Sequence, residues 1–400
     1  MAITPVFCCG MECGLSNASN IGQHWIGGTV TFSTTVVNNG LRSLTWNTSA
    51  AQFSRQTSNI LSGSVGVGRF YINITTNPSV SIHVVGIMES ATRAAGLCYN
   101  VADGKYYAGF DSGSGALTFG ATGITLSTGV WYCVDVKADF TANPWLVDVS
   151  VNKSGLGQAS IALAASTASE GLIGVATRTS TTVINVDDVV LSTTAADYPI
   201  GGGKVLSYVP NADGTHTFTT TIGVRGTTAA PTGGGNIAGS TDSYQWINAR
   251  PMGGGASDST RLWNQQTNGS TLYGEVGFED SVEVYPPRGI DVIIIRRDAS
   301  TGTGDSTFKL NDNGTENTIY ATGAVAGVAS DEYHRKHYAT APSTGVAWTT
   351  ALFNGVKFRF GYSADANPDH YCRGVMIEAE FPVVSLPIRH RSYRNVLLRR

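Results

Sequence analysis

The stretch that decides the fold is residues 131–151, which read WYCVDVKADFTANPWLVDVSV. In residues 131–136 and again in 145–151, apolar side chains alternate with polar ones, which is the period of a half-buried β-strand. Asn143 and Pro144 lie between the two runs, where a loop is expected because proline is excluded from the middle of a sheet. The stretch therefore predicts two long, paired strands.

Outward from this pair, the same alternation recurs through the first half of the chain. Asn38, Asn39 and Gly40 follow one such run as a turn. The other runs are residues 29–37, 41–46, 68–74, 81–87, 171–176 and 183–191. Strands at spacings of about 8–12 residues, separated by Gly and Asn, predict an antiparallel β-sandwich.

The composition agrees with an all-β fold. Charged residues make up 14% of the 400-residue chain, against roughly a quarter in an ordinary soluble domain. The 48 glycines, 16 tyrosines and 14 phenylalanines suit strands joined by tight turns, whereas long amphipathic helices need residues that are scarce here. A helix bundle or an α/β enzyme is not expected.

Charge and hydropathy exclude further classes. With 26 basic and 29 acidic residues the net charge is −3, which does not suit specific nucleic-acid binding. No apolar run reaches the length that membrane insertion needs. The first ten residues do not resemble a signal peptide, so we expect synthesis in a cytoplasm without export, where the six cysteines would be buried, reduced thiols.

A second all-β region is expected after residues 199–204. Tyr198 and Pro199 precede three consecutive glycines, Gly201 to Gly203, and such a flexible segment predicts a linker that few packed contacts cross. Strand-like runs follow at residues 281–285, 290–295, 356–361 and 374–381. Residues 307–310 and 318–320 read as a hairpin around the Asn313–Gly314 turn.

The last segment, residues 382–400, differs in composition. It holds two prolines and no acidic residue, so we expect an extended basic arm. The arm would dock on an acidic partner surface, because Arg forms bidentate contacts with carboxylates. The alternative is a solvated tail. The docking residues would be Arg389, Arg391, Arg394, Arg399 and Arg400.

We expect no catalytic residues. Sandwich glycosidases need closely spaced carboxylates, and the nearest pattern places Glu279, Ser281 and Glu283 on one strand face. A solvated acidic patch is the favoured interpretation. Neither a nucleophile elbow nor a phosphate-binding loop occurs in the sequence.

No metal site is predicted either. Cys8, Cys9 and Cys13 offer three thiolates, but no fourth ligand lies at zinc-motif spacing, which favours a small apolar knot. His334 and His337 on a strand would face opposite sides of the sheet.

Calcium is the one ion that stays open, and no cofactor is predicted. Asp187 and Asp188 lie inside an apolar strand and need partners. They would be satisfied by a turn or a sheet edge, or one of them would hold calcium. The Asn311–Gly314 segment superficially resembles a calcium loop but lacks its other ligands.

Sugar binding is the strongest option for a site. Aromatic rings stack on sugars, and Asn side chains fix hydroxyl groups. Trp131 and Trp145 are expected in the core of the sandwich. Trp25, together with Trp263 and the neighbouring Asn264, is a better candidate for glycan contact, with packing as the alternative.

Residues 7–191 resemble the concanavalin A-like jelly-roll fold. The resemblance rests on three motifs: Leu41-Arg-Ser-Leu44, Gly129-Val-Trp-Tyr132 and Val186-Asp-Asp-Val189. Together with the linker, the later strand-like runs and the basic segment, it gives four parts: a jelly-roll β-sandwich over residues 1–198, the linker 199–204, a second β-sandwich over 205–381 and the arm 382–400. The carboxylate motif of enzymes with this fold is missing.

The order of later motifs is similar to that of a structural protein family of tailed-bacteriophage virions, of the minor tail, minor capsid or head-decoration type. These motifs are residues 187–191, 197–201, 205–210 and 341–350. The resemblance implies a non-enzymatic protein on the exterior of the particle. Its partners would be other virion proteins and further copies of itself in a symmetric assembly. A module that binds host-surface glycans is the alternative, and a glycoside hydrolase ranks last.

Overall fold

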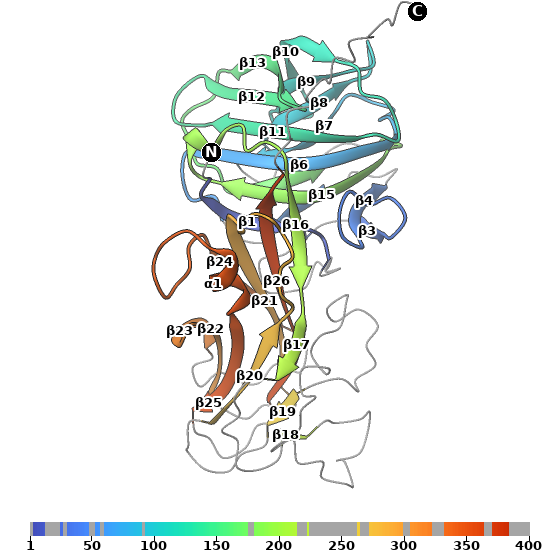
Figure 1. Ribbon diagram of the computed structural model, residues 1–400. Coiled ribbons are helices and arrows are strands. Elements are labelled where there is room, and N and C mark those ends of the chain that lie inside the picture. Colours follow the sequence, from blue (N-terminus) through green and yellow to red (C-terminus); the bar gives the residue numbers. More distant parts are fainter. Residues whose placement is uncertain are drawn as a thin grey trace, which may run out of the picture.

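The computed structural model describes residues 3–12, 25–26, 30–47, 53–56, 60–89, 93–174, 180–213, 222–223, 262–264, 272–298, 305–321, 332–363 and 370–383. Within these ranges the chain is almost entirely antiparallel β-structure, which confirms the predicted fold class. Two sandwiches stack end to end (Figure 1), and the strands of the upper one run roughly across those of the lower one.

The larger sheet of the first sandwich contains the strands that decided the fold. Its order is β13-β12-β11-β6-β15-β4-β3, with β1 paired to β15. Its strands are β1 (Pro5–Cys9), β3 (Val30–Ser33), β4 (Ser43–Asn47), β6 (Val65–Thr76), β11 (Trp131–Asp139), β12 (Trp145–Val151), β13 (Ser154–Ile161) and β15 (Val183–Ser192). Strands β11 and β12 are antiparallel neighbours with Asp139 opposite Leu146, as residues 131–151 predict.

The second sheet packs on the first and encloses the core. Its order is β10-β9-β8-β7-β14-β5-β2. These strands are β2 (Trp25–Ile26), β5 (Phe53–Gln56), β7 (Ile82–Met88), β8 (Ala94–Asn100), β9 (Lys105–Asp111), β10 (Leu117–Ile124) and β14 (Glu170–Gly174). Phe70, Phe140 and Trp145 are fully buried in the core, and burying one such side chain stabilises the fold by about 1.5–3 kcal/mol. Trp131, which was expected there too, is only half-buried.

The second sandwich also has two sheets. One has the order β18-β19-β26-β21-β24 with β16 paired to β26, and the other β17-β20-β25-β22-β23. Their strands are β16 (Gly203–Tyr208), β17 (Pro210–Asp213), β18 (Ile222–Gly223), β19 (Leu262–Asn264), β20 (Leu272–Phe278), β21 (Gly289–Asp298), β22 (Asp305–Asp312), β23 (Thr315–Ala321), β24 (Glu332–Tyr338), β25 (Lys357–Ser363) and β26 (His370–Pro382). The predicted hairpin is β22–β23, and Asn313 and Gly314 form its turn at φ of 49° and 86°.

Within the described ranges, two short helices interrupt the β-structure. A 3₁₀-helix, η1 (Ala195–Asp197), follows β15. An α-helix, α1 (Thr350–Asn354), is capped by Thr349. The side chain of this N-cap residue accepts a hydrogen bond from the backbone N–H of Leu352. Among the described residues, no helix is long and apolar enough to cross a membrane.

Residues 281–285 form an irregular segment, so the strand expected there is wrong. The backbone N–H of Ser281 donates to the side-chain oxygen of Asn354 rather than to a neighbouring strand. Val282 and Val284 are 93% and 85% exposed. Their alternation imitates a strand, but Pro286 and Pro287 follow at once and cannot continue a ladder.

The sandwiches meet at a packed joint, formed by β1, β6 and β15 on one side and β16, β21, β24 and β26 on the other. The expectation that few packed contacts cross residues 199–204 is therefore wrong. Strand β16 already begins at Gly203. A Cβ atom on Gly10 would lie 2.6 Å from the backbone oxygen of Val205. Gly10 therefore allows the two sandwiches to approach each other closely, because it has no side chain.

Candidate functional site

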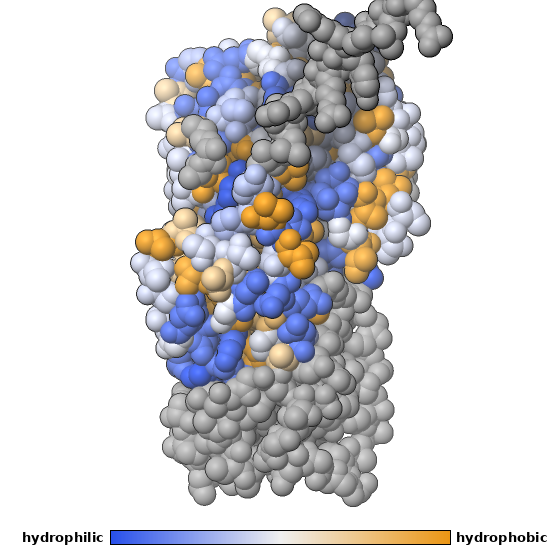
Figure 2. Space-filling view, in the orientation of Figure 1, coloured by the Kyte–Doolittle hydropathy of each residue, from blue (hydrophilic) through white to orange (hydrophobic). Residues whose placement is uncertain are grey.

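A pocket of about 600 Å³ opens beside the joint and draws its walls from both sandwiches. Ile3 and Thr4 come from the first sandwich, just before β1. The rest come from three segments of the second: Tyr285, Pro286, Pro287 and Arg288; Ala339, Thr340, Ala347 and Trp348; and Pro382. We call this the composite pocket. Figure 2 shows apolar side chains among hydrophilic ones at the level where the sandwiches meet.

The walls of the composite pocket are rigid and mostly apolar. Tyr285 is 44% exposed, whereas Trp348 is almost completely covered. The indole N–H of Trp348 donates to the backbone oxygen of Tyr338 at 3.0 Å, which fixes the ring as a wall. Pro286 and Pro287 restrict the backbone that carries Tyr285. The pocket thus presents an exposed aromatic ring beside fixed apolar surface and two exposed threonines, Thr4 and Thr340.

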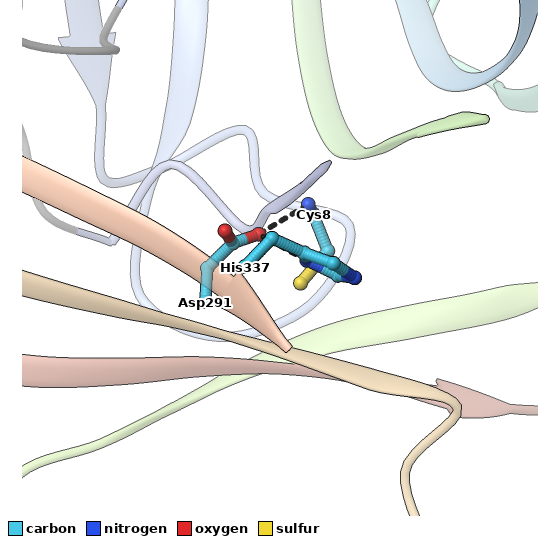
Figure 3. A group of neighbouring side chains, drawn as sticks. All are labelled: Cys8, Asp291 and His337. Carbon is cyan, nitrogen blue, oxygen red and sulfur yellow. Dashed lines mark hydrogen bonds and ion pairs between the residues drawn. The ribbon is translucent and has the colours of Figure 1, made fainter. Parts of the chain in front are cut away.

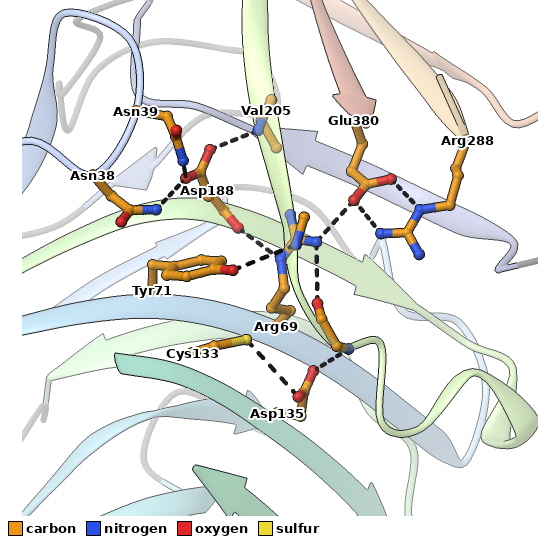
Figure 4. A network of polar contacts seen from close by, with 12 residues as sticks. Asn38, Asn39, Arg69, Tyr71, Cys133, Asp135, Asp188, Val205, Arg288 and Glu380 are labelled. Atoms are coloured by element: carbon orange, nitrogen blue, oxygen red, sulfur yellow. Dashed lines mark hydrogen bonds and ion pairs between the residues drawn. The ribbon is translucent and has the colours of Figure 1, made fainter. Parts of the chain in front are cut away.

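Arg288 lines the composite pocket and also contacts a buried carboxylate of the joint. Its guanidinium donates to both carboxylate oxygens of Glu380, with Nε 2.5 Å from Oε2. Glu380 also accepts from Nη1 of Arg69 at 2.8 Å, and both of these side chains are fully buried. One carboxylate on β26 therefore joins an arginine of the first sandwich to an arginine in the pocket wall (Figure 4).

Arg69 is the centre of this polar network. Its Nε donates to the backbone oxygen of Asp188 and its Nη1 to that of Gly201. Burial by itself lowers the pKa of Arg69, but the neighbouring Glu380 carboxylate raises that pKa above its ordinary value. The guanidinium is therefore charged, and its charge is matched inside the joint.

The Asp187–Asp188 pair has the turn and edge partners that the sequence analysis expected. Asp187 accepts from the backbone N–H groups of Asn38 and Asn39. Asp188 accepts from both asparagine side chains and, at 2.6 Å, from the backbone N–H of Val205. Burial raises the pKa of both carboxyl groups, and for Asp187 the neighbouring Asp188 raises it further. The pair fastens the Asn38–Asn39 turn to β16.

The acidic segment 279–283 lines a smaller pocket of about 300 Å³ together with Glu12. Glu283 pairs with Lys204 at 2.8 Å, and Glu279 accepts from the backbone N–H of Val209 at 3.3 Å. Because the segment is not a strand, the predicted alternation of Glu279, Ser281 and Glu283 on one sheet face does not apply. Both glutamates already accept hydrogen bonds from the protein.

A second cluster in the joint brings Cys8 of β1 to Asp291 of β21 and His337 of β24 (Figure 3). The backbone N–H of Cys8 donates to Oδ2 of Asp291 at 2.5 Å, and Nδ1 of His337 lies 3.3 Å from the same oxygen. Burial, reinforced by Asp291, raises the pKa of the Cys8 thiol well above its ordinary value. This thiol is therefore unsuited to act as an exposed nucleophile.

Several predicted residues lie outside what the structure describes. Trp25 belongs to β2, and Trp263 and Asn264 to β19, but their side chains are not described. Cys13 and the arm residues Arg389, Arg391, Arg394, Arg399 and Arg400 are outside the described ranges. These predicted site residues therefore stay predictions.

The composite pocket was not predicted from the sequence, although Tyr285-Pro286-Pro287 was a signal for it. Two consecutive prolines end any strand pairing, so the tyrosine before them had to lie in irregular backbone. Exposed aromatic residues in loops are stronger candidates for binding than those inside strands. The wall residues before β1 and after β24 carried no such signal, because only the joint brings them near Tyr285.

No family model matches this chain, and no curated protein does. Solved structures with weak similarity include domain 4 of AbnA, a GH43 extracellular arabinanase from Geobacillus stearothermophilus, in complex with arabinotriose. It is 14% identical with a TM-score of 0.32, over 46% of this chain and 80% of that one. The carbohydrate-binding module CBM66 from Bacillus subtilis is 13% identical, with a TM-score of 0.31, over 44% and 98%.

The N-terminal CBM22-1–CBM22-2 tandem of Xyn10C from Paenibacillus barcinonensis aligns along most of both chains. It covers 94% of this chain and 97% of that one, at 10% identity and a TM-score of 0.25. Likenesses of this strength carry no argument about what the present chain binds. Its function has to be argued from its own residues.

Proposed function

We propose that this chain is a non-enzymatic saccharide-binding protein and that the composite pocket holds the sugar. The observation that carries the proposal is the exposed ring of Tyr285 in a pocket of about 600 Å³ with rigid apolar walls. Ligand pockets of about 300–1,000 Å³ combine such walls with a few polar groups that set orientation.

The chemistry of the lining supports this ligand class. A sugar ring offers an apolar C–H face and a rim of hydroxyl groups, and Tyr285 supplies an aromatic face of matching size. Thr4 and Thr340 are exposed and carry hydroxyl groups. Arg288 is occupied by Glu380, so the pocket has no need of an anionic partner. A neutral mono- or disaccharide unit fits these features best.

The proposal is tested with a glycan array, followed by calorimetry on the best ligand, with and without calcium. We expect Tyr285→Ala to weaken binding at least about tenfold, which corresponds to roughly 1.4 kcal/mol. Tyr107→Ala, which removes a tyrosine of the first sandwich, is the matched control and should leave the affinity unchanged. Binding that survives Tyr285→Ala but is lost in Trp25→Ala or Trp263→Ala would move the site to those tryptophans. If the chain binds no glycan on the array, the proposal is contradicted.

A structural component of a tailed-phage virion is a second candidate, either with or without saccharide binding. The buried joint supports it, because a protein built as one stiff unit suits a repeated part of a particle exterior. Immunogold electron microscopy of intact particles is the test, with label on the head or the tail as the expected result. This candidate would be rejected if intact particles carry no label and denatured particles do not contain the chain.

A further inference from the structure

The Cys8–Asp291–His337 cluster has the composition of a metal site. Its three potential ligand atoms are a thiol sulfur, a carboxylate oxygen and an imidazole nitrogen, and all lie within 4.8 Å of one another. Zinc binds these three ligand types in proteins. They come from three strands of two sandwiches, β1, β21 and β24 (Figure 3), so an ion held by them would cross-link the joint.

Packing sets the orientation of the His337 ring. A Cβ atom on Gly289 would lie 2.9 Å from Cε1 and 3.0 Å from Nε2 of His337, and 2.9 Å from Cγ of Pro5. Nε2 thus packs close to the backbone of Gly289, whereas Nδ1 faces Asp291. A ring held with one nitrogen toward the Asp291 carboxylate is a preorganised ligand.

The described residues do not satisfy the full hydrogen-bonding capacity of the cluster. Asp291 is 1% exposed, and its Oδ1 has no hydrogen-bond partner in the described part of the chain. A buried carboxylate oxygen without a partner is costly. The Cys8 thiol donates to the backbone oxygen of Glu378 at 3.4 Å and lies beside the Asp291 carboxylate.

The charges of the surrounding groups also accommodate a divalent cation. Arg335 pairs with Glu378 at 2.7 Å and lies 3.6 Å from Asp291, so two carboxylates share one guanidinium. The acidic side chains here outnumber the one guanidinium, so a cation bound beside them would add the positive charge that a low-dielectric interior needs.

We propose that Cys8, Asp291 and His337 bind one divalent transition-metal ion, zinc being the best match. The ion fastens the N-terminal strand to the second sandwich. This site is independent of the composite pocket and of saccharide binding. Binding displaces the thiol proton of Cys8, so the affinity falls as the pH falls.

The test uses the full chain, stripped with a chelator and titrated with Co²⁺ and then with Zn²⁺. We expect about one ion per chain, a thiolate-to-cobalt charge-transfer band in the near ultraviolet, and a rise in the melting temperature with zinc. His337→Ala should weaken binding at least about tenfold, and Cys8→Ser should abolish the charge-transfer band.

His334→Ala is the matched control, since this histidine lies three residues away on the same strand and on its other face. Cys98→Ser is the corresponding control for a buried thiol outside the cluster. Both should bind like the wild type. The wild-type titration remains decisive if the ligand variants fail to fold. A stripped wild-type chain that takes up neither ion, or binds cobalt without the charge-transfer band, would overturn the proposal.

Discussion

At the scale of single residues, the joint depends on charges buried in apolar strands. Arg69 is fully buried in β6 and donates to Glu380, which is fully buried in β26. A buried ion pair of this kind contributes little net stability by itself, because both groups lose their hydration. Removing one partner is nevertheless expensive, since the other charge stays behind without compensation. Such residues therefore specify how two surfaces fit.

Arg69→Met is predicted to destabilise the fold by about 1.5–3 kcal/mol, because Glu380 loses a buried charged hydrogen bond while Arg288 still compensates its charge. Urea unfolding at neutral pH measures the effect. Lys137→Met is the control, because it breaks a partly exposed pair with Asp148 and should cost about 0–1 kcal/mol. Equal losses in the two variants would show that the buried pair has no special role.

At the scale of elements, β20 and β25 are held together by one carboxylate as well as by their backbone ladder. Glu275 on β20 accepts from Lys357 at 3.0 Å and from Arg359 at 2.8 Å, both on β25, and from Asn311 on β22. Burial raises the pKa of Glu275, but hydrogen bonds from Asn311, Arg359 and Lys357 outweigh it and lower that pKa below its ordinary value of 4.5. The acid form is therefore less favourable in the folded chain.

This lowered pKa predicts the direction of acid destabilisation. Because the folded pKa lies below the unfolded one, the stabilisation is fully present above about pH 4.5. It is lost as the pH falls through the folded value. Glu275→Gln should flatten the acid limb of the stability curve, measured by urea unfolding between about pH 2 and 7. Arg359→Met should flatten it in part. An unchanged limb in Glu275→Gln would contradict this account.

At the scale of the whole molecule, the two sandwiches are joined by two sets of buried contacts. One set is Arg69, Asp188, Arg288 and Glu380, and the other is Cys8, Asp291, Arg335 and Glu378. The composite pocket draws residues from both sandwiches. The proposed saccharide site is thus a property of the assembled pair.

Local periodicity was enough to predict most strands and the β22–β23 hairpin, because strand formation and tight turns depend on neighbours in sequence. Periodicity failed at residues 281–285, where alternation is present without a partner strand. The joint could not be predicted in this way, because its pairs, such as Arg69 and Glu380, are 311 positions apart. A weaker signal existed: Arg69, Asp291, Glu378 and Glu380 are charges inside otherwise apolar runs, and such charges need distant partners.

The position of β1 has a consequence for the order of folding during synthesis. This strand is made well before its partner β15, which ends at Ser192. Its Cys8 then bonds to Asp291, to Arg335 and to Glu378, 283, 327 and 370 positions later. Synthesis must therefore pass Glu378 before β1 reaches its final environment. Until Ser192 is made, the nascent chain carries β1 as an unpaired apolar strand, which is exposed to chaperones and to mispairing with a neighbouring copy.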